Sequence, residues 1–315
     1  MNGVNSTQIR VLTYNVEGLP WPARSGRARY LDAIGRQLAL DRRNGTGADI
    51  VLLQEAFSSA AASAVVASGF PNRVSGPSLG SRRSKASDDA PPSLADRRKV
   101  RRGEGIGPVL GSGLWILSDY PVIASANLAF RRGECAGSDC LAKKGVQWAR
   151  IQIPGVPSAL EVFNTHLQSR GASGVSRNRS FAAHRLQLNE VSRFILRHRD
   201  QGHPLIFGGD FNMRNSARRF EQFDLKQPWP LVHRYCSNPH NACRVLASWD
   251  GDAPWMDTQD LQGFSSAPAI HVRPVQAETR YDQPWGGSRL ADHDGLFVTY
   301  QLSWRGTLPI EKPCG

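Results

Sequence analysis

The chain has 315 residues, of which 39 are Lys or Arg and 27 are Asp or Glu, so its formal net charge is +12. No run of about 18 apolar residues occurs, which argues against a membrane-spanning helix. The excess of positive charge favours polyanionic partners such as nucleic acid or an anionic lipid surface, without choosing between them. Arg-rich usage that serves solubility alone is the alternative.

The cysteines form two close pairs in turn-rich segments. Cys135 and Cys140 bracket the loop CAGSDC, and Cys236 and Cys243 bracket CSNPHNAC. This arrangement predicts two local disulfides and therefore an oxidising compartment, secreted or periplasmic. A zinc site is the competing interpretation, although neither spacing matches the usual metal-knuckle pattern. Cys314 has no evident partner.

The N-terminal residues do not indicate the cellular compartment as clearly as the cysteines do. Residues 1–8 are polar and lack the basic start and apolar stretch of a signal peptide. We therefore expect either that a leader is absent from this chain or that the protein stays in the cytoplasm.

In chain order, the first elements alternate between short apolar runs and helical periodicity. The pattern predicts strands at 9–14 and 50–54 and helices at 27–40 and 59–67. Residues 73–107 differ, because they carry nine Lys or Arg, four acids and almost no apolar side chains. Such a segment buries too little surface to offset its chain entropy, so it is predicted to be a basic flexible insert.

The strand pattern resumes after this insert, which indicates one domain over 1–315. Further strands are predicted at 113–117, 122–128, 146–153, 160–165, 204–208 and 295–302, with a long helix at 178–199. Mixed strands and helices with hairpin-like neighbours favour a layered α/β domain.

Polar side chains follow the apolar strands at the points where those strands end. These residues are Asn15, Gln54 and Glu55, Asn164 and His166, Asp210 and Asn212, and Asp292 and His293 just before the last strand. Strand ends are where rigid scaffolds present functional groups. Asn and Asp are also common turn residues, but Glu55 does not fit that simpler explanation.

Five motifs in this set resemble those of the endonuclease/exonuclease/phosphatase superfamily, which includes DNase I-like nucleases, inositol polyphosphate 5-phosphatases and neutral sphingomyelinases. The motifs are TYNVEG, LLQEAF, FNTHLQ, GGDFN and ADHDGL, in the family order and spread over nearly the whole chain. The resemblance implies a four-layer α/β sandwich, in which two packed mixed β-sheets are flanked by helices, with the active site at one sheet edge.

The resemblance also implies a divalent cation, expected to be Mg²⁺, with Mn²⁺ or Ca²⁺ as possible substitutes. Glu55 is the expected main ligand, Asn15 supplies a further oxygen, and Asp292 is expected near the same or a second ion. His293 is the candidate general base, because an imidazole titrates near neutral pH. Asp260 is expected to orient His293, with Asp257 as the fallback.

The remaining family positions would act on water and phosphate. Asp210 is expected to orient or polarise the attacking water, whereas Asn212 and His166 donate to the phosphate. The other histidines are expected to be structural or on the surface: two in the long helix (His184, His198) and four in loops (His203, His233, His240, His271). No HExxH, nucleophile elbow or P-loop is present.

The substrate is predicted to be a lipid phosphodiester, as in sphingomyelinases or phospholipases C. The stretch KKGVQWAR at 143–150 resembles one in neutral sphingomyelinases, and Trp21 and Trp285 flank the predicted site. No clear apolar hairpin lies between Ser265 and Trp285, so membrane contact is assigned to the basic insert. No obligate protein partner is evident.

There are three alternatives to a lipid phosphodiesterase. A nuclease is the first, because the net charge and the basic insert suit a phosphate backbone. An inositol polyphosphate phosphatase is the second. A non-catalytic binding protein on the same fold is disfavoured because Glu55, Asp210 and His293 are all present.

Overall fold

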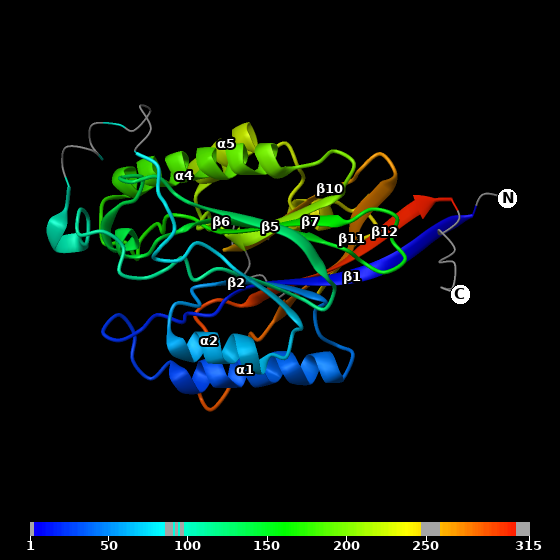
Figure 1. The fold of residues 1–315 in the computed structure, drawn as a ribbon, viewed down its shortest axis with the longest axis horizontal. Coiled ribbons are helices and arrows are strands. Elements are labelled where there is room, and N and C mark those ends of the chain that lie inside the picture. The colour runs from blue at the N-terminus through cyan, green and yellow to red at the C-terminus, as the bar shows by residue number, and fades with distance from the viewer. Residues whose placement is uncertain (1–2, 86–90, 92–93, 95–97, 247–258, 307–315) are drawn as a thin grey trace.

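Two β-sheets pack face to face, and helices cover the outer face of each (Figure 1). The computed structural model describes residues 3–85, 91, 94, 98–246 and 259–306. Its four layers are α1 and α2, a seven-stranded sheet, a five-stranded sheet, and α4 with α5. The predicted four-layer α/β sandwich is therefore confirmed. None of the described helices is both long enough and apolar enough to cross a membrane.

The seven-stranded sheet has the order β3-β4-β2-β1-β12-β11-β9. Its strands are β1 (Val4–Asn15), β2 (Ile50–Gln54), β3 (Asn72–Ser75), β4 (Trp115–Ser118), β9 (Arg244–Leu246), β11 (Ile270–Arg280) and β12 (Gly295–Arg305). At its centre β1 runs parallel to β2 and antiparallel to β12.

The five-stranded sheet has the order β10-β8-β7-β6-β5. Its strands are β5 (Val122–Ala129), β6 (Gly145–Ile151), β7 (Leu160–His166), β8 (Leu205–Asp210) and β10 (Asp260–Ser265). Here β7 and β8 are parallel, and β10 pairs with β8 in the antiparallel sense.

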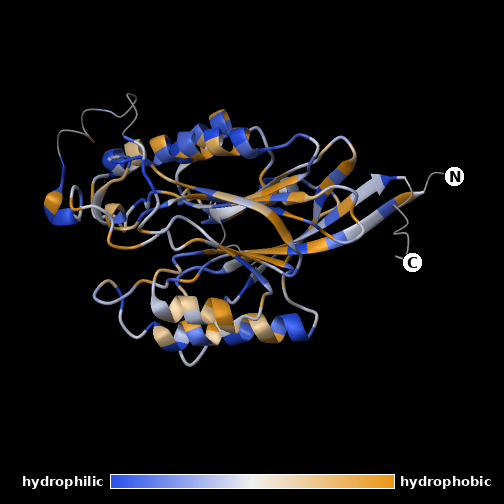
Figure 2. Cartoon of the chain, in the orientation of Figure 1, coloured by the Kyte–Doolittle hydropathy of each residue, from blue (hydrophilic) through white to orange (hydrophobic). Residues whose placement is uncertain are grey.

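The helices pack their apolar faces onto the sheets and leave polar faces outside (Figure 2). They are α1 (Ala28–Arg43), α2 (Ser59–Ala67), α4 (Arg177–His198), α5 (Ala217–Lys226), the short α6 (Val232–Ser237) and the 3₁₀ turns η1 (Val100–Arg102) and η2 (Gly137–Leu141). One apolar cluster fills the space between the sheets, and separate clusters lie under α1 with α2 and under α4 with α5. Burial of the apolar side chains in these three clusters is the main favourable contribution to folding.

Buried amides join the two sheets across this core. Gln54 Nε2 of β2 donates to Asn164 Oδ1 of β7 at 2.8 Å, and Asn164 Nδ2 donates to the Leu53 carbonyl at 3.0 Å. On the other side, Gln262 Nε2 of β10 donates to the Val11 carbonyl at 3.1 Å. Because a buried polar group without a partner costs free energy, these bonds favour one registration of the sheets.

The predicted disulfides Cys135–Cys140 and Cys236–Cys243 are both present, with S–S distances of 2.04 and 1.97 Å. The zinc interpretation of these cysteines is therefore wrong. Cys314 lies outside the described residues.

Three sequence predictions need correction. β11 was missed, because it alternates buried and exposed residues and contains Pro274 at a register shift beside β12. His271 therefore lies on a strand and His233 in the helix α6, where both had been predicted in loops. His184 is fully buried, and its Nε2 lies 2.9 Å from the Phe211 carbonyl, as expected for a structural histidine.

The described residues of the basic segment 73–107 pack against the rest of the domain. The segment begins inside β3, Leu94 is buried against α4, and Glu104 is only 3% exposed. Glu104 accepts hydrogen bonds from Arg179 Nε of α4 at 2.8 Å and from the Gly137 amide of η2 at 2.8 Å. The described parts of this segment therefore tie α4 to η2, which its composition did not predict.

Glu104→Gln should lower the free energy of unfolding at pH 7 by about 3 kcal/mol, because it leaves Arg179 without its carboxylate. Burial raises the pKa of Glu104, but bonds from Arg179, Lys99 and Gly137 lower it more, so the folded-state pKa lies below the usual value. The stabilisation is thus present above the unfolded pKa of about 4.3 and is lost as pH falls through the lower folded pKa.

Urea titrations of wild type and Glu104→Gln from pH 7 to pH 3 measure this difference in the free energy of unfolding. Glu221→Gln, on the exposed face of α5, is the control. A difference between wild type and Glu104→Gln that stayed constant down to pH 3 would contradict the assignment.

Candidate active site

The ends of four parallel strands meet at one edge of the sandwich. Asn15 ends β1 and lies opposite Gln54 at the end of β2, which Glu55 follows directly. In the other sheet His166 and Asp210 are register partners at the ends of β7 and β8. Parallel strands present their carboxyl ends at the same edge, and this topology brings residues from distant parts of the chain together.

Asp210 is at the centre of this group and is buried. Its Oδ2 accepts from Asn15 Nδ2 at 3.1 Å, and its Oδ1 accepts from the Asn212 amide at 2.9 Å. The same Oδ2 lies 3.3 Å from His166 Nε2 and 3.9 Å from His293 Nε2. Burial raises the pKa of Asp210 to about 6, against the lowering effect of His293.

Glu55 faces the same point from the seven-stranded sheet. Its φ is +57°, in the left-handed region that few non-glycine residues adopt, and such strain clusters at functional sites. Glu55 Oε1 lies 3.9 Å from His166 Nε2. Burial raises the pKa of Glu55 to about 7, although Lys144 and His293 lower it. Two carboxylates with raised pKa values, the partly buried Glu55 and the buried Asp210, favour binding of a cation between them.

Asp260 and His293 form a second pair beside Asp210. Asp260 starts β10 opposite Asp210, and its Oδ1 lies 3.3 Å from His293 Nδ1. Its Oδ2 accepts from the backbone amide of Asn15 at 3.2 Å. Burial alone would lower the pKa of His293, but Asp260 and Asp210 raise it to about 10. Asp260 therefore occupies the orienting position predicted for it, whereas Asp257 lies outside the described residues.

Lys144 is a site residue for which the sequence had suggested no role. Its ammonium donates to His166 Nε2 at 3.0 Å, to Asp139 Oδ2 at 2.8 Å and to the Leu167 carbonyl at 2.9 Å. Burial, and next to it Lys144, hold the pKa of His166 well below its usual value, so this imidazole is neutral. The motif KKG drew attention to this stretch, but two adjacent lysines do not reveal which one faces the site.

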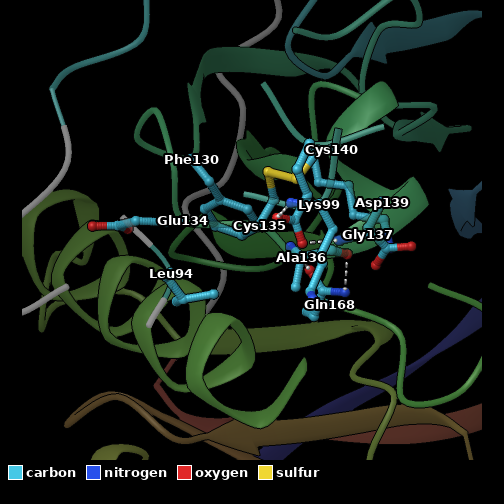
Figure 3. The surroundings of a disulfide bond; sticks show 12 residues. Leu94, Lys99, Phe130, Glu134, Cys135, Ala136, Gly137, Asp139, Cys140 and Gln168 are labelled. Atoms are coloured by element: carbon cyan, nitrogen blue, oxygen red, sulfur yellow. Dashed lines mark hydrogen bonds and ion pairs between the residues drawn. A yellow bond between two sulfur atoms is a disulfide. The ribbon is translucent and has the colours of Figure 1, made fainter. Parts of the chain in front are cut away.

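The turn that carries Asp139 is fixed by the first disulfide and by Gln168, which follows β7 by two residues (Figure 3). Gln168 Oε1 accepts from the Ala136 amide at 2.8 Å, and Gln168 Nε2 donates to the Ala136 carbonyl at 2.8 Å. Asp139 Oδ2 also accepts from the Ser169 amide at 2.6 Å. The position of Lys144 therefore depends on several contacts around η2.

Asp292 is the predicted ligand that the structure does not bring to this centre. Its side chain is half exposed, its carboxylate lies 3.9 Å from Arg24, and its amide donates to Glu17 at 3.1 Å. Asn212 lies beside Asp210, but its Nδ2 donates to the Leu167 carbonyl at 3.1 Å. Its φ of +53° is tolerated because Asn adopts this region more readily than most residues.

The two tryptophans noted in the sequence lie on the surface. Trp21 is 80% exposed and Trp285 is 44% exposed, and the Trp285 ring contacts Tyr30 edge to face at 5.7 Å between centroids. Exposed indoles suit an apolar or interfacial ligand.

Two overlapping groups of side chains have the spacing of metal ligands. One is Glu55, His166 and Asp210, and the other is Asp210, Asp260 and His293, with the ligand atoms of each group within 4.8 Å of one another. Asn15 Oδ1 accepts one bond, from the Glu17 amide at 3.1 Å, which leaves a second lone pair. Carboxylate and amide oxygens are the donors that Mg²⁺ prefers, so these residues fit such an ion.

Known proteins provide three comparisons. The chain is 25% identical over 214 residues to a sphingomyelinase of Mycobacterium tuberculosis, covering 67% of this chain but 35% of that protein, so it spans about a third of the relative's length. A beta toxin variant of Staphylococcus aureus with bound magnesium ions has a TM-score of 0.64 at 17% identity, covering 93% of this chain and 99% of the toxin. D. rerio TDP2 complexed with a single-strand DNA product has a TM-score of 0.60 at 18% identity, covering 93% and 99%.

Both structural likenesses concern the fold, since their identities are low. The family model described as Endonuclease/Exonuclease/phosphatase matches residues 12–293, a span that contains each of the converging residues from Asn15 to His293. The chain therefore belongs to the Endonuclease/Exonuclease/phosphatase family.

Proposed function

We propose that this chain is a metal-dependent phosphodiesterase that hydrolyses a choline-bearing lipid such as sphingomyelin by direct attack of water. The observation that supports it most strongly is the convergence of Glu55, His166, Asp210 and His293 on one point at the sheet edge. No single nucleophilic side chain is needed for such a reaction, because water attacks phosphorus directly.

The cation in this proposal is Mg²⁺, with Mn²⁺ or Ca²⁺ as possible substitutes. Glu55 and Asp210 would hold it, and Asn15 would supply a neutral oxygen. When bound, it supplies charge stabilisation for the phosphoryl oxygens. Asp292 is left out of this ligand set, since it is turned toward Arg24.

His293 takes the proton from water, and Asp260 orients the ring through Nδ1, which leaves Nε2 facing Asp210. The raised pKa of His293 depends partly on Asp210, so a cation held by the Asp210 carboxylate would lower that pKa. Asp210 also orients the water between itself and His293.

A second group of side chains, beside His166 rather than His293, would hold the phosphate. Lys144 and His166 lie together, and Asn212 is beside them. The positive charge of the Lys144 ammonium, which His166 Nε2 accepts from, stabilises the non-bridging oxygens, whose negative charge grows in the transition state. Asp139 acts on the reaction only by positioning Lys144.

The lipid substrate is supported by likeness to sphingomyelinases and by the exposed indoles of Trp21 and Trp285. The basic segment would add contact with an anionic membrane. The two disulfides favour a secreted or periplasmic protein. A nuclease is the second candidate, because the net charge of +12 favours a phosphate backbone.

A substrate panel tests these proposals. Sphingomyelin micelles, plasmid DNA and bis-p-nitrophenyl phosphate are incubated with wild type, His293→Ala and His271→Ala, the last being an exposed histidine on β11. With Mg²⁺, wild type and His271→Ala should release phosphocholine, and His293→Ala should be slower by about 100-fold or more.

EDTA should stop turnover, and added Mg²⁺ should restore it. Turnover that persists in EDTA would reject the metal, and plasmid nicking without phosphocholine release would replace the lipid substrate by nucleic acid.

Lys144→Met should raise the pKa of His166 in the metal-free protein, because it removes a neighbouring cation while burial stays the same. The ring signals of His166 in NMR spectra report this pKa. Lys143→Met is the matched control, since its ammonium bonds to the Leu79 and Ser81 carbonyls. An unchanged titration of His166 in Lys144→Met would show that the contact does not influence the ring.

A further inference from the structure

A cavity lies beside the Cys135–Cys140 disulfide. It has a volume of about 890 Å³, within the range of small-molecule sites, and the proposed catalytic and metal-binding residues are not among its lining residues. Five of its lining side chains are cations, and we refer to it as the cationic cavity. These are Arg82, Arg83, Arg98, Arg132 and Lys143.

The described residues around the cavity carry more positive than negative charge. In the described part of the chain, none of the five cations forms an ion pair with a carboxylate. Among the described lining residues the one acid is Glu104, which accepts from the Arg179 guanidinium and from the amides of Lys99 and Gly137. Glu104 is thus committed to its own contacts, and the acids that act on Arg83, Glu190 and Glu134, do not line the cavity.

Two of the cations are partly withdrawn from water and held in place by carbonyl groups. The ammonium of Lys143, 6% exposed, donates to the carbonyls of Leu79 and Ser81. Arg83 donates through Nε to the Phe130 carbonyl at 2.7 Å and through a terminal nitrogen to the Arg131 carbonyl at 3.0 Å. Both groups are therefore fixed before any ligand arrives, which reduces the entropic cost of binding.

The lowered pKa values of Lys143 and Arg83 show that placing these cations close together costs free energy. Burial lowers the pKa of Lys143, and Arg83 and Arg132 lower it further. Burial also lowers the pKa of Arg83, with Arg132 as the next contribution, and these two effects exceed the raising effect of Glu190 and Glu134. Each cation therefore destabilises its neighbours, and a bound anion would relieve that repulsion.

We propose that the cationic cavity binds a compact ligand with clustered phosphate groups, at a site separate from the catalytic centre. Guanidinium groups bind phosphate oxygens through paired hydrogen bonds, and an ammonium adds a point charge. The disulfide and the glycines Gly105 and Gly133 also line the cavity, and at the glycines the backbone can approach a ligand closely. The ligand is either a free polyphosphorylated molecule or the headgroup of a phosphate-bearing lipid.

Calorimetric titration with inorganic pyrophosphate in EDTA tests the site, with the full chain as it stands. The variant is Arg98→Gln/Arg132→Gln, because both side chains are exposed and neither makes a side-chain bond in the described structure. The control Arg36→Gln/Arg43→Gln removes the same charge from α1, on the other side of the molecule. Pyrophosphate affinity should fall by about ten-fold or more in the cavity variant and stay within about two-fold in the control.

Equal affinities in wild type and the cavity variant, or no binding to wild type at millimolar pyrophosphate, would overturn the proposal. Because the readout is binding in EDTA, it does not depend on hydrolysis, so the phosphodiesterase proposal can fail without affecting it. Full hydrolytic activity of the cavity variant toward bis-p-nitrophenyl phosphate should accompany the lost binding.

Sedimentation with phosphatidylcholine vesicles containing phosphatidic acid distinguishes the two ligand sources. A lipid headgroup predicts that the cavity variant loses more vesicle binding than the charge-matched control. A free ligand predicts that both variants lose vesicle binding equally, while the difference in pyrophosphate affinity remains.

Discussion

The carboxylate of Asp210, buried where the two sheets meet, is the group on which the rest of the site depends. Its neighbours come from both sheets: the amide of Asn15 from one, and His166 and Asp260 from the other. A buried carboxylate is costly unless donors or cations surround it. The same need for compensating charge makes the point beside Glu55 suitable for a divalent cation and raises the pKa of His293.

The sandwich supplies this geometry through its parallel strand pairs and its buried amides. β1 with β2 and β7 with β8 end at the same edge, so four functional residues need no loop to place them. The bonds of Gln54 to Asn164 and of Gln262 to Val11 fix one sheet against the other. Sites on regular elements are held more precisely than sites on loops, which suits an in-line reaction.

The local sequence predicted the site residues whose positions are determined by a single strand. Glu55 and Asp210 follow short apolar strands, and both strands and the polar residues after them were recognised. Lys144 was not assigned a role, because its partner His166 is 22 residues away and the choice between two lysines depends on the η2 turn. The contact between Asp292 and Arg24 could not be predicted, because proximity to His293 in sequence does not reveal it.

The composition of the basic segment predicted a flexible insert, because composition does not reveal the contacts of a single residue. The basic segment contains Glu104, whose bonds to Arg179 and Gly137 tie α4 to the disulfide turn. Charge counts also could not show that Arg83 and Lys143 meet at one cavity. Long-range electrostatic partners of this kind are determined by tertiary structure alone.

The most direct test of the convergence at Asp210 is the anomalous diffraction of crystals soaked in Mn²⁺. The account predicts a peak within coordination distance of the Glu55 and Asp210 carboxylates, on the side that faces His293. A bound Mn²⁺ ion at any other position, with Glu55 making no contact to it, would contradict the account.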